Sequence, residues 1–404
     1  MVETETTVQR YERYKESGIS WLEQIPEHWE LKRFKHIFKE KKITHNVELN
    51  CGSISFGKVV YKDDEKIPVS TKKSYQVLNK GEFLINPLNL NYDLKSLRIG
   101  LSDKDVVVSS GYIIVQNTTE IYKDYYKWLL HIFDVAFMKT LGSGVRQTLS
   151  FTHIANSELV FPPLPEQTKI AQFLDDKTTK IDEAIAIKAQ QINLLKERKQ
   201  ILIHKAVTRG LDDSVTLKDS GVEWIGEIPE HWEVKRLKHC LNINNGSDYK
   251  HIQTDEGYPV IGSGGQFAYA SDYMYDGEVV LLGRKGTIDK PLYFKGKFWA
   301  VDTMFYANAI NGNIVKYLYY LATTLPFSYY STATALPSMT QGDLNNHPIS
   351  RPPIDEQNKI VDFIENGTQK IETAIGLKQQ EIAKLKEYKS SLINGVVTGK
   401  VRVY

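Results

Sequence analysis

The stretch SGISWLEQIPEHWELKRFKH occupies residues 17–36, and SGVEWIGEIPEHWEVKRLKH occupies residues 220–239. The two stretches match in register 203 positions apart, and each contains two tryptophans and the complete sequence IPEHWE. Chance does not account for a match of this kind. The sequence therefore predicts an internal duplication.

A second, longer pair of matching stretches lies further along the chain. Residues 161–208 begin FPPLPEQTKIAQFL and residues 351–398 begin RPPIDEQNKIVDFI, an offset of 190. The segments that precede them, about 37–160 and 240–350, barely resemble each other, and the first is about 13 residues longer, the difference between the two offsets. A duplication with constant flanks and different middles indicates one scaffold that presents two different heads.

Length and composition bound the class of protein. The chain has 404 residues, enough for about two or three domains, and 41% hydrophobic with 11% aromatic residues exclude a disordered or collagen-like chain. The 51 Lys and Arg nearly balance the 49 Asp and Glu, which leaves a net charge of +2. If the partner is DNA, the positive charge that meets it must be concentrated locally.

Cysteine content and hydropathy indicate the compartment. The two cysteines, Cys51 and Cys240, cannot make a disulfide framework and fit a reducing environment. The N-terminal residues are acidic and polar, unlike a signal peptide, and no stretch approaches about 18 uncharged apolar residues. We therefore expect a cytoplasmic protein without a membrane span.

The longer repeated stretch predicts helices. Pro165 suits a first helical position and Asp355, its counterpart, suits a cap. A short helix is expected first, interrupted at Asp175-Asp176 in one copy and at Asn366-Gly367 in the other. A longer helix of about 30 residues, roughly 45 Å long, should follow. Its ends are marked by Thr208-Arg209-Gly210 and Thr398-Gly399.

The longer helix carries a coiled-coil pattern, because its seam positions alternate by four and three residues. The seam residues are Ile181, Ile185, Lys188, Ile192, Leu195, Lys199, Leu202 and Ala206, and in the second copy Ile371, Ile375, Lys378, Ile382, Leu385, Lys389, Leu392 and Val396. Neither stripe can be buried alone, so the simplest arrangement packs the two helices together with pseudo-two-fold symmetry. The alternative is two separate domains, each with its helix packed on its own core.

Both helical regions carry a local excess of positive charge. Residues 176–209 contain eight Lys and Arg against four Asp and Glu, and residues 366–402 contain seven against three, so each region has a charge of +4. A solvated helical face explains this excess. So does a nearby polyanion or acidic partner.

Both variable segments contain short strands and glycine-rich turns. The stretch Gly277–Leu282 predicts a buried strand that runs into the loop Gly283-Arg284-Lys285-Gly286-Thr287. Its counterpart is Gly81–Ile85, which leads into Asn86-Pro87. A basic loop between glycines lets the backbone approach a phosphate closely, although an ordinary charged turn has the same composition.

Three further polar stretches are candidate DNA-contacting tips: GSGVRQT at 142–148, IGSGGQ at 261–266 and SMTQ at 338–341. Arg and Gln side chains in exposed loops can read guanine and adenine edges with paired hydrogen bonds, whereas loop solvation also explains any one of them. The candidate DNA-binding residues are Arg146, Gln147, Thr148, Ser263, Gln266, Arg284, Lys285, Thr340 and Gln341.

No catalytic motif is present in the sequence. There is no GxxxxGK[ST] phosphate loop, HExxH pair, zinc-spaced Cys/His cluster or GxSxG elbow. Asp64-Glu65-Lys66 and Asp175-Asp176-Lys177 have a nuclease-like D-x-K spacing, but no Pro-Asp partner precedes them. His28 and His231 lie in the repeated IPEHWE turn, where packing explains them better than chemistry. We therefore expect no catalytic, cofactor-binding or metal-binding residue in this chain.

The ordered duplication resembles the specificity subunit of Type I restriction-modification systems. The resemblance rests on the paired IPEHWE-[LV]-KR-[FL]-K blocks, the paired PP-[LI]-x-EQ-x-K-I blocks and the basic helices that follow the latter. The loop at 283–287 with FWAVDT at 298–303, and GSGVRQ at 142–147, are similar to recurrent patterns of target recognition domains. The resemblance covers nearly the whole chain.

This resemblance implies an α+β fold. Two strand-rich target recognition domains would be joined by two long antiparallel coiled-coil helices in a pseudo-two-fold tandem repeat. The expected boundaries are 1–160 for the first target recognition domain with an N-terminal conserved arm, 161–211 for a central conserved helical region, 212–350 for the second target recognition domain and 351–404 for a C-terminal conserved helical region.

The resemblance also implies a function. Each target recognition domain would read half of an asymmetric, bipartite site in double-stranded DNA, while the helices set the unread spacer and dock two modification subunits. Those partners bind S-adenosylmethionine and methylate adenine, and a restriction partner, a translocase-nuclease, uses ATP and Mg²⁺. The chain itself would be non-catalytic, bind no cofactor and need no second copy of itself. Two other hypotheses remain: a stand-alone enzyme with an unfamiliar active site, and a coiled-coil scaffold whose two heads bind proteins.

Overall fold

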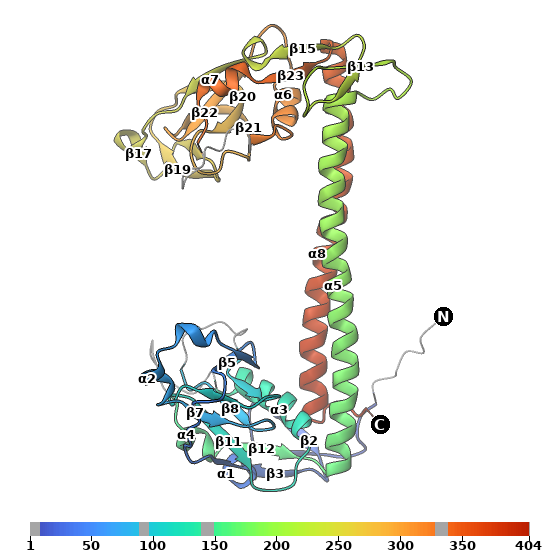
Figure 1. Ribbon diagram of the computed structural model, residues 1–404. Coiled ribbons are helices and arrows are strands. Elements are labelled where there is room, and N and C mark those ends of the chain that lie inside the picture. The colour runs from blue at the N-terminus through green and yellow to red at the C-terminus, as the bar shows by residue number, and fades with distance from the viewer. Residues whose placement is uncertain (1–8, 89–96, 139–148, 328–337, 404) are drawn as a thin grey trace. The chain divides into compact units, whose positions relative to one another are not determined.

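The computed structural model describes residues 9–88, 97–138, 149–327 and 338–403. The chain divides into two compact units (Figure 1). Unit 1 comprises residues 1–187 and 381–404, and unit 2 comprises residues 188–380. Each unit contains one strand-rich region and one part of each long helix, because both helices continue from one unit into the other.

The strand-rich region of unit 1 is built around a four-stranded antiparallel sheet. Its strands in spatial order are β4 (Phe38–Glu40), β11 (Ile113–Asn117), β8 (Phe83–Ile85) and β9 (Ile99–Leu101). Two-stranded antiparallel sheets surround it: β1 (Tyr14–Glu16) with β2 (Gln24–Pro26), β3 (Glu30–Arg33) with β12 (Glu158–Phe161), β5 (Gly52–Ser55) with β6 (Lys58–Tyr61), and β7 (Gln76–Leu78) with β10 (Val106–Val108). The helices of this region are α1 (Phe34–Ile37), α2 (Val69–Lys72), α3 (Lys123–Ala136) and α4 (Phe151–Ala155).

The strand-rich region of unit 2 has a larger, seven-stranded sheet. Its strands in spatial order are β16 (Leu241–Asn245), β22 (Met304–Ala309), β20 (Tyr275–Gly283), β21 (Leu292–Ala300), β18 (Tyr258–Gly262), β19 (Gly265–Ala270) and β17 (Gln253–Thr254). The β18–β21 pair is parallel and the other pairs are antiparallel. The region also contains the pairs β13 (Leu217–Asp219) with β14 (Glu227–Pro229) and β15 (Glu233–Arg236) with β23 (Pro348–Arg351). Its α-helices in the described residues are α6 (Val315–Ala322) and α7 (Gln341–Asn346).

The duplicated sequence folds twice into the same local structure. In unit 1, β3 pairs with β12 so that Glu30 faces Phe161, and in unit 2, β15 pairs with β23 so that Glu233 faces Arg351. Both predicted buried strands form as well, since Gly277–Leu282 lies within β20 and residues 83–85 of the other stretch form β8. The two variable regions nevertheless differ in sheet size and strand order, as unlike sequences require.

The long helices α5 (Leu164–Arg209, 46 residues) and α8 (Ile354–Val397, 44 residues) are each continuous. The predicted interruptions at Asp175-Asp176 and Asn366-Gly367 are therefore wrong, and each helix is roughly 66–69 Å long rather than about 45 Å. At Asp175, tertiary contacts override the local tendency of aspartate to interrupt a helix. Asp175 accepts hydrogen bonds from Lys127 and Trp128, both at 3.0 Å, instead of bonding its own backbone.

The N-terminal ends of the two long helices differ slightly from the prediction, and their C-terminal ends agree with it. Pro165 is the second residue of α5 rather than the first, and Asp355 lies in the first turn of α8 rather than at its cap. Gly210 and Gly399 follow the two helices with φ of 75° and 78°. Only glycine adopts this left-handed conformation without strain, so the predicted C-terminal signals are confirmed.

Within each unit the two long helices pack against each other (Figure 1). In unit 2, Lys199 Nζ lies 2.7 Å from Glu372 Oε1, and Leu202 approaches Gly367. Residue numbers rise along α5 as they fall along α8, so the helices are antiparallel there. In unit 1 the equivalent seam lysine, Lys389, lies 2.6 Å from an Asp182 carboxylate oxygen. The predicted paired helices are confirmed, and all the predicted seam residues are buried or half-buried.

The helix ends also belong to the cores of the units. The start of α5 contributes Ile170 and Leu174 to the core of unit 1, together with Val396 and Val397 from the end of α8. The core of unit 2 is built reciprocally from residues of the end of α5 and the start of α8: Ile203, Ala206, Val207, Ile360, Val361 and Ile364. Packing in pairs and packing on a core, which the sequence analysis treated as alternatives, therefore occur together. In the described part of the chain, no helix combines the length and the apolar character needed to cross a membrane.

Candidate nucleic-acid interface

The first repeated motif docks onto the second through one glutamate in each unit. Glu166 accepts hydrogen bonds from Trp29 Nε1 at 2.8 Å and lies 2.7 Å from His28 Nε2. Glu356 makes the same contacts with Trp232 at 2.9 Å and His231 at 2.6 Å. Both indoles are fully buried, so their N–H groups need an acceptor. The two histidines thus have a structural role, as the sequence analysis expected.

The glutamine after each of these glutamates ties a long helix to the variable region. Gln167 Oε1 accepts from the backbone N–H of Tyr122, the N-cap of α3, at 2.9 Å. Gln357 Oε1 accepts from the backbone N–H of Ile314, the N-cap of α6, also at 2.9 Å. Both glutamines are fully buried. The repeated Glu-Gln pair therefore fixes each variable region to a conserved long helix, although the two variable regions differ in sequence.

A buried tyrosine makes a second link in each unit, which sequence reasoning missed. Tyr125 Oη in α3 donates to the Val397 carbonyl at the end of α8, at 2.9 Å. Tyr317 Oη in α6 lies within hydrogen-bond distance of two carbonyl acceptors, Ser350 in β23 at 3.1 Å and Val207 in α5 at 3.2 Å. Burial raises the pKa of both tyrosines, so they remain neutral donors. The signal in the sequence was weak, because the two tyrosines are 192 positions apart within otherwise dissimilar segments.

Two loops meet in the same way at the head of each unit. In unit 1, the backbone N–H of Leu149 donates to the Pro87 carbonyl at 3.0 Å, which joins the loop after β8 to the segment before α4. In unit 2, the N–H of Met339 donates to the Arg284 carbonyl at 3.0 Å, and Lys285 pairs with Ser338. The structure thus joins two stretches that the sequence analysis selected separately.

The short helix after this junction is capped alike in both units. Ser150 caps α4 and Thr340 caps α7, each through a capping box. Thr340 Oγ1 accepts from the Asp343 N–H at 3.1 Å, and Gln341 Nε2 donates to the Ile243 carbonyl at 2.5 Å. Thr340 and Gln341 therefore have internal hydrogen bonds in this structure, although both were proposed as DNA contacts.

The other candidates of unit 2 converge on the turn between β21 and β22. Arg284 N–H donates to the Thr303 carbonyl at 2.8 Å, and the Arg284 guanidinium lies 5.8 Å from the ring centroid of Phe305. On the other side of the same turn, Val301 N–H donates to the Ile261 carbonyl at 3.2 Å. This contact links the end of β18, which precedes the turn with Ser263 and Gln266, to the same β21–β22 turn that Arg284 contacts. Lys285 and Gln266 are exposed, and Arg284 and Ser263 are half-buried.

The remaining candidates, Arg146, Gln147 and Thr148, lie outside the described residues. The structure does place the residue that follows them, because Leu149 makes the loop junction with Pro87. All nine candidate DNA contacts remain predictions.

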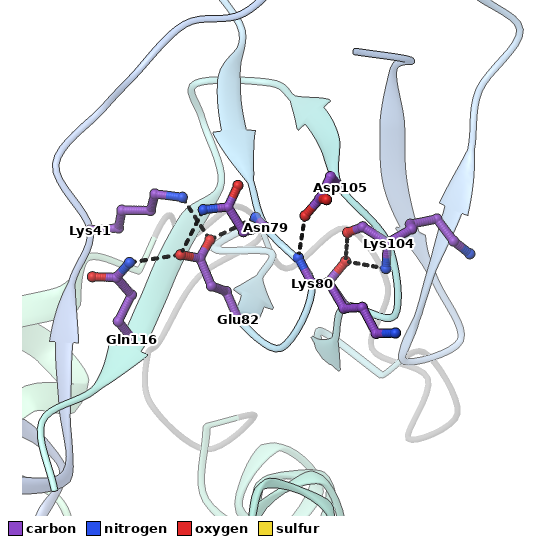
Figure 2. A network of polar contacts seen from close by, with 8 residues as sticks. Lys41, Asn79, Lys80, Glu82, Lys104, Asp105 and Gln116 are labelled. Atoms are coloured by element: carbon purple, nitrogen blue, oxygen red, sulfur yellow. Dashed lines mark hydrogen bonds and ion pairs between the residues drawn. The ribbon is translucent and has the colours of Figure 1, made fainter.

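A buried carboxylate fixes the strand that leads into the unit 1 junction. Glu82 accepts from Lys41 Nζ at 2.7 Å, from Gln116 Nε2 at 2.7 Å and from the Asn79 N–H at 2.8 Å (Figure 2). The charges of Lys41 and Glu82 are almost completely withdrawn from water, which pairing and hydrogen bonding make tolerable. The counterpart Glu278 pairs with Lys295 at 2.8 Å on a more exposed surface. The sequence carried a signal for this carboxylate, because a glutamate follows glycine at the start of both predicted strands, as Gly81-Glu82 and Gly277-Glu278.

The two D-x-K aspartates have structural partners. Asp64 lies 2.7 Å from Lys72 Nζ and accepts from the Cys51 N–H at 2.7 Å, and the Lys72 hydrogen bond lowers the pKa of that carboxyl. Burial raises the pKa of the thiols of Cys51 and Cys240, which keeps them protonated. Among the described residues, no group of three His, Cys, Asp or Glu side chains is arranged to hold a metal ion.

Comparison with known proteins identifies the family. The model of the Type I restriction modification DNA specificity domain matches residues 26–197 and again residues 229–387. The chain therefore belongs to this family, and DNA recognition for a Type I system is its function. The predictions of a non-catalytic specificity subunit and of an α+β fold with two long paired helices are confirmed by this membership and by the relatives that follow.

Curated relatives and solved structures cover the same extent of chain. The MjaVIII specificity subunit of Methanocaldococcus jannaschii is 25% identical over 96% of this chain and 97% of its own length, and the putative MjaX specificity subunit of the same organism is 24% identical over 96% and 98%. A solved chain from a study of assembly of the type I R-M system has a TM-score of 0.72 at 14% identity, over 92% of this chain and 98% of its own. The HsdS subunit of Thermoanaerobacter tengcongensis has a TM-score of 0.54 at 15% identity, over 93% and 98%. These two structures support the fold.

Proposed function

We propose that the chain reads a bipartite, asymmetric site in double-stranded DNA, with one half-site assigned to the head of each unit. The observation that carries the proposal is the repeated loop junction, Leu149 to Pro87 in unit 1 and Met339 to Arg284 in unit 2. In both units a backbone N–H just before a short helix donates to a carbonyl in the loop after a buried strand, while the side chains of the two loops differ. A shared frame with different side chains is what two readers of unlike half-sites require.

The proposal extends to the partners. Two modification subunits bind the chain, because it presents the same scaffold twice, and these subunits supply S-adenosylmethionine and methylate adenine. Where a restriction subunit joins, it supplies ATP and Mg²⁺. The chain itself binds none of these cofactors. The +4 charge of each helical region favours acidic partner surfaces or the DNA backbone near the helices.

Segment exchange tests the assignment of half-sites. Residues 37–160 are replaced with the corresponding segment of a relative, the complex is reconstituted with modification subunits, and methylated adenines are mapped by single-molecule sequencing. One half of the recognised site should change and the other should stay. The reciprocal exchange of residues 240–350 is the matched control and should change the other half. A simultaneous change in both halves from either exchange would contradict the proposal.

A protein-binding scaffold is the competing function. Under that hypothesis the complex would retain no specific DNA, and association with its partner would be insensitive to salt. DNA recognition instead predicts affinity that falls steeply with salt concentration, because phosphate contacts release counterions. The chain alone, with S-adenosylmethionine, should methylate no DNA.

A further inference from the structure

Phe267 is an exposed aromatic side chain that the sequence analysis did not single out. It lies within β19, directly after the candidate Gln266, yet 57% of its surface is accessible to solvent. A single exposed apolar side chain is ordinary on a protein surface, so the position of this ring beside a candidate DNA contact and the way it is held carry the argument. The local strand geometry explains why this one points outward.

Phe267 is the extra residue of a β-bulge. In the β18–β19 pair, Val260 faces Ala268 and Ile261 faces Gln266, so nothing on β18 faces Phe267. A bulge places two residues of one strand opposite one residue of the other and redirects a side chain that would otherwise alternate. As a result, two consecutive residues, Gln266 and Phe267, are both exposed.

The Phe267 ring is held in place on two sides. The Tyr249 ring meets it edge-on, with 5.4 Å between centroids and 90° between planes. A Cβ on Gly262 would lie only 3.2 Å from the Phe267 ring, so the glycine permits this close approach. The ring is therefore supported from behind while its outer surface stays free to contact a ligand.

Two cations of a connected loop favour nucleic acid as the ligand of this ring. The β18–β19 turn is linked to the turn after β21 by the bond from Val301 to Ile261, and Arg284 is linked to that same turn through Thr303. Arg284 and the exposed Lys285 are thus connected, through the turn that contains Asp302, to the strand that leads into Gln266 and Phe267. Lysine and arginine side chains bind phosphates, whereas an amide and an apolar ring contact base edges. Together these groups form a surface that can read bases.

We propose that Gln266 and Phe267 together read one A·T base pair in the half-site of unit 2, with the Phe267 ring against the thymine 5-methyl group. In the major groove, adenine presents N7 and the N6 amino group, which an amide can bond in pairs, and thymine presents its methyl group on the same edge. Gln266 and Phe267 lie at the start of β19, next to the turn that joins it to β18, so the end of this strand pair would face the groove. The inference rests on the proposed function and adds a specificity-determining residue, Phe267, to it.

Deoxyuridine, which lacks only the 5-methyl group, provides the test. The exchange of residues 240–350 first identifies the half-site of unit 2. Each thymine of that half-site is then replaced by deoxyuridine, one at a time, in a duplex with the complete site. The dissociation constant of the reconstituted complex is measured by fluorescence anisotropy. At one position the unaltered complex should lose about four-fold in affinity, the loss expected for one buried methyl group.

Variants then assign that loss to Phe267. The Phe267→Ala complex should bind the thymine duplex more weakly and no longer distinguish thymine from deoxyuridine at that position. Phe267→Leu keeps an apolar contact and should retain part of the discrimination, which separates loss of the contact from loss of folding. Phe56→Ala removes an even more exposed ring, 75% accessible, from unit 1 and should keep the full four-fold effect.

Three results would overturn the inference. The first is that deoxyuridine at no position of the half-site changes the affinity of the unaltered complex, and the second is that the Phe267→Ala complex still distinguishes thymine from deoxyuridine. The third is that Phe267→Ala leaves DNA affinity unchanged but releases a protein subunit, which would make the ring a protein contact. If the exchange of residues 240–350 alters neither half-site, the proposed function itself fails. If that exchange alters one half-site and the deoxyuridine test is negative, only the role of Phe267 fails.

Discussion

Single residues explain why the two short repeated motifs recur as a pair. Glu166 accepts a hydrogen bond from Trp29, and Glu356 accepts one from Trp232, although each glutamate lies more than a hundred residues from its tryptophan. A fully buried indole N–H without an acceptor is costly, so a change on either side of the pair is penalised. The repetition of both motifs therefore reflects one contact made twice.

This contact yields a stability prediction. Glu166→Ala removes the acceptor of the buried Trp29 N–H and should lower the free energy of unfolding of unit 1 by about 1–3 kcal/mol. Glu166→Gln keeps an acceptor oxygen and should cost less. Urea unfolding followed by tryptophan fluorescence measures both. Glu27→Ala is the control, because its exposed carboxylate is 3.8 Å from Arg13 and should contribute less than about 0.5 kcal/mol. Equal losses for the Ala and Gln variants would contradict the assigned role.

His347 gives unit 2 a predictable response to acid. Its ring is buried beside Trp224, with 5.2 Å between centroids, and burial lowers its pKa to about 4 from an ordinary 6.5. Below about pH 6.5 the unfolded chain takes up a proton that the folded chain refuses, so stability is present above that pH and lost as pH falls toward 4. Between about pH 7.5 and pH 5 the loss should be about 2 kcal/mol. Urea unfolding at both pH values should show a smaller loss for His347→Phe, and an unchanged loss would refute the assignment.

At the scale of elements, the sequence predicted the features that local periodicity and turn residues determine. It did not predict the features that depend on contacts between residues far apart in the chain. The seam of α5 and α8, their C-terminal glycines and the strand within β20 follow from periodicity and turn chemistry. The continuity of α5 past Asp175 does not, because the partners of Asp175 lie on α3, in a segment with no counterpart pattern. The bulge at Phe267 was equally inaccessible, since strand register depends on the neighbouring strand.

Two glycines within α8 give a matched pair of substitutions. A Cβ on Gly376 would meet no atom within 4 Å, whereas a Cβ on Gly367 would lie 2.9 Å from Leu202 Cδ1. Gly376→Ala should therefore stabilise the chain by about 0.5–1 kcal/mol, because alanine loses less backbone entropy in a helix. Gly367→Ala should gain less or destabilise, since Leu202 must move. Thermal unfolding of both variants tests this difference, and equal gains would show that the helices do not pack closely at Gly367.

At the scale of the whole molecule, the duplication distributes each long helix over both units. Unit 1 holds the start of α5 and the end of α8, and unit 2 holds the rest of each. The pairs Lys199–Glu372 and Asp182–Lys389 are equivalent under the 190-residue offset. The same contact thus forms once in each unit, as expected if the two halves of the chain arose by duplication of one ancestral sequence. The unread spacer of the DNA site should then depend on both helices together.

Lengthening both helices tests this dependence. One turn, roughly four residues, is inserted after Gln190 and also after Gln380, which are equivalent positions in the two copies. Each helix gains about 6 Å. Since DNA rises about 3.4 Å per base pair, the unread gap should grow by one or two base pairs while both half-sites stay the same. The inserted turn also rotates each helix by about 40° beyond a full turn, so the seam is disturbed and some stability should be lost.

Methylated adenines mapped in the reconstituted complex report the gap directly. An insertion of the same length after Leu211, in the exposed connection beyond α5, is the control and should leave the gap unchanged, because it lies outside both helices. The expected result is a longer gap for the double helical insertion alone. A folded, active complex with an unaltered gap would show that the helices do not measure the spacer. A changed gap in the control would place the measurement in the connections instead, because only the connections are altered there.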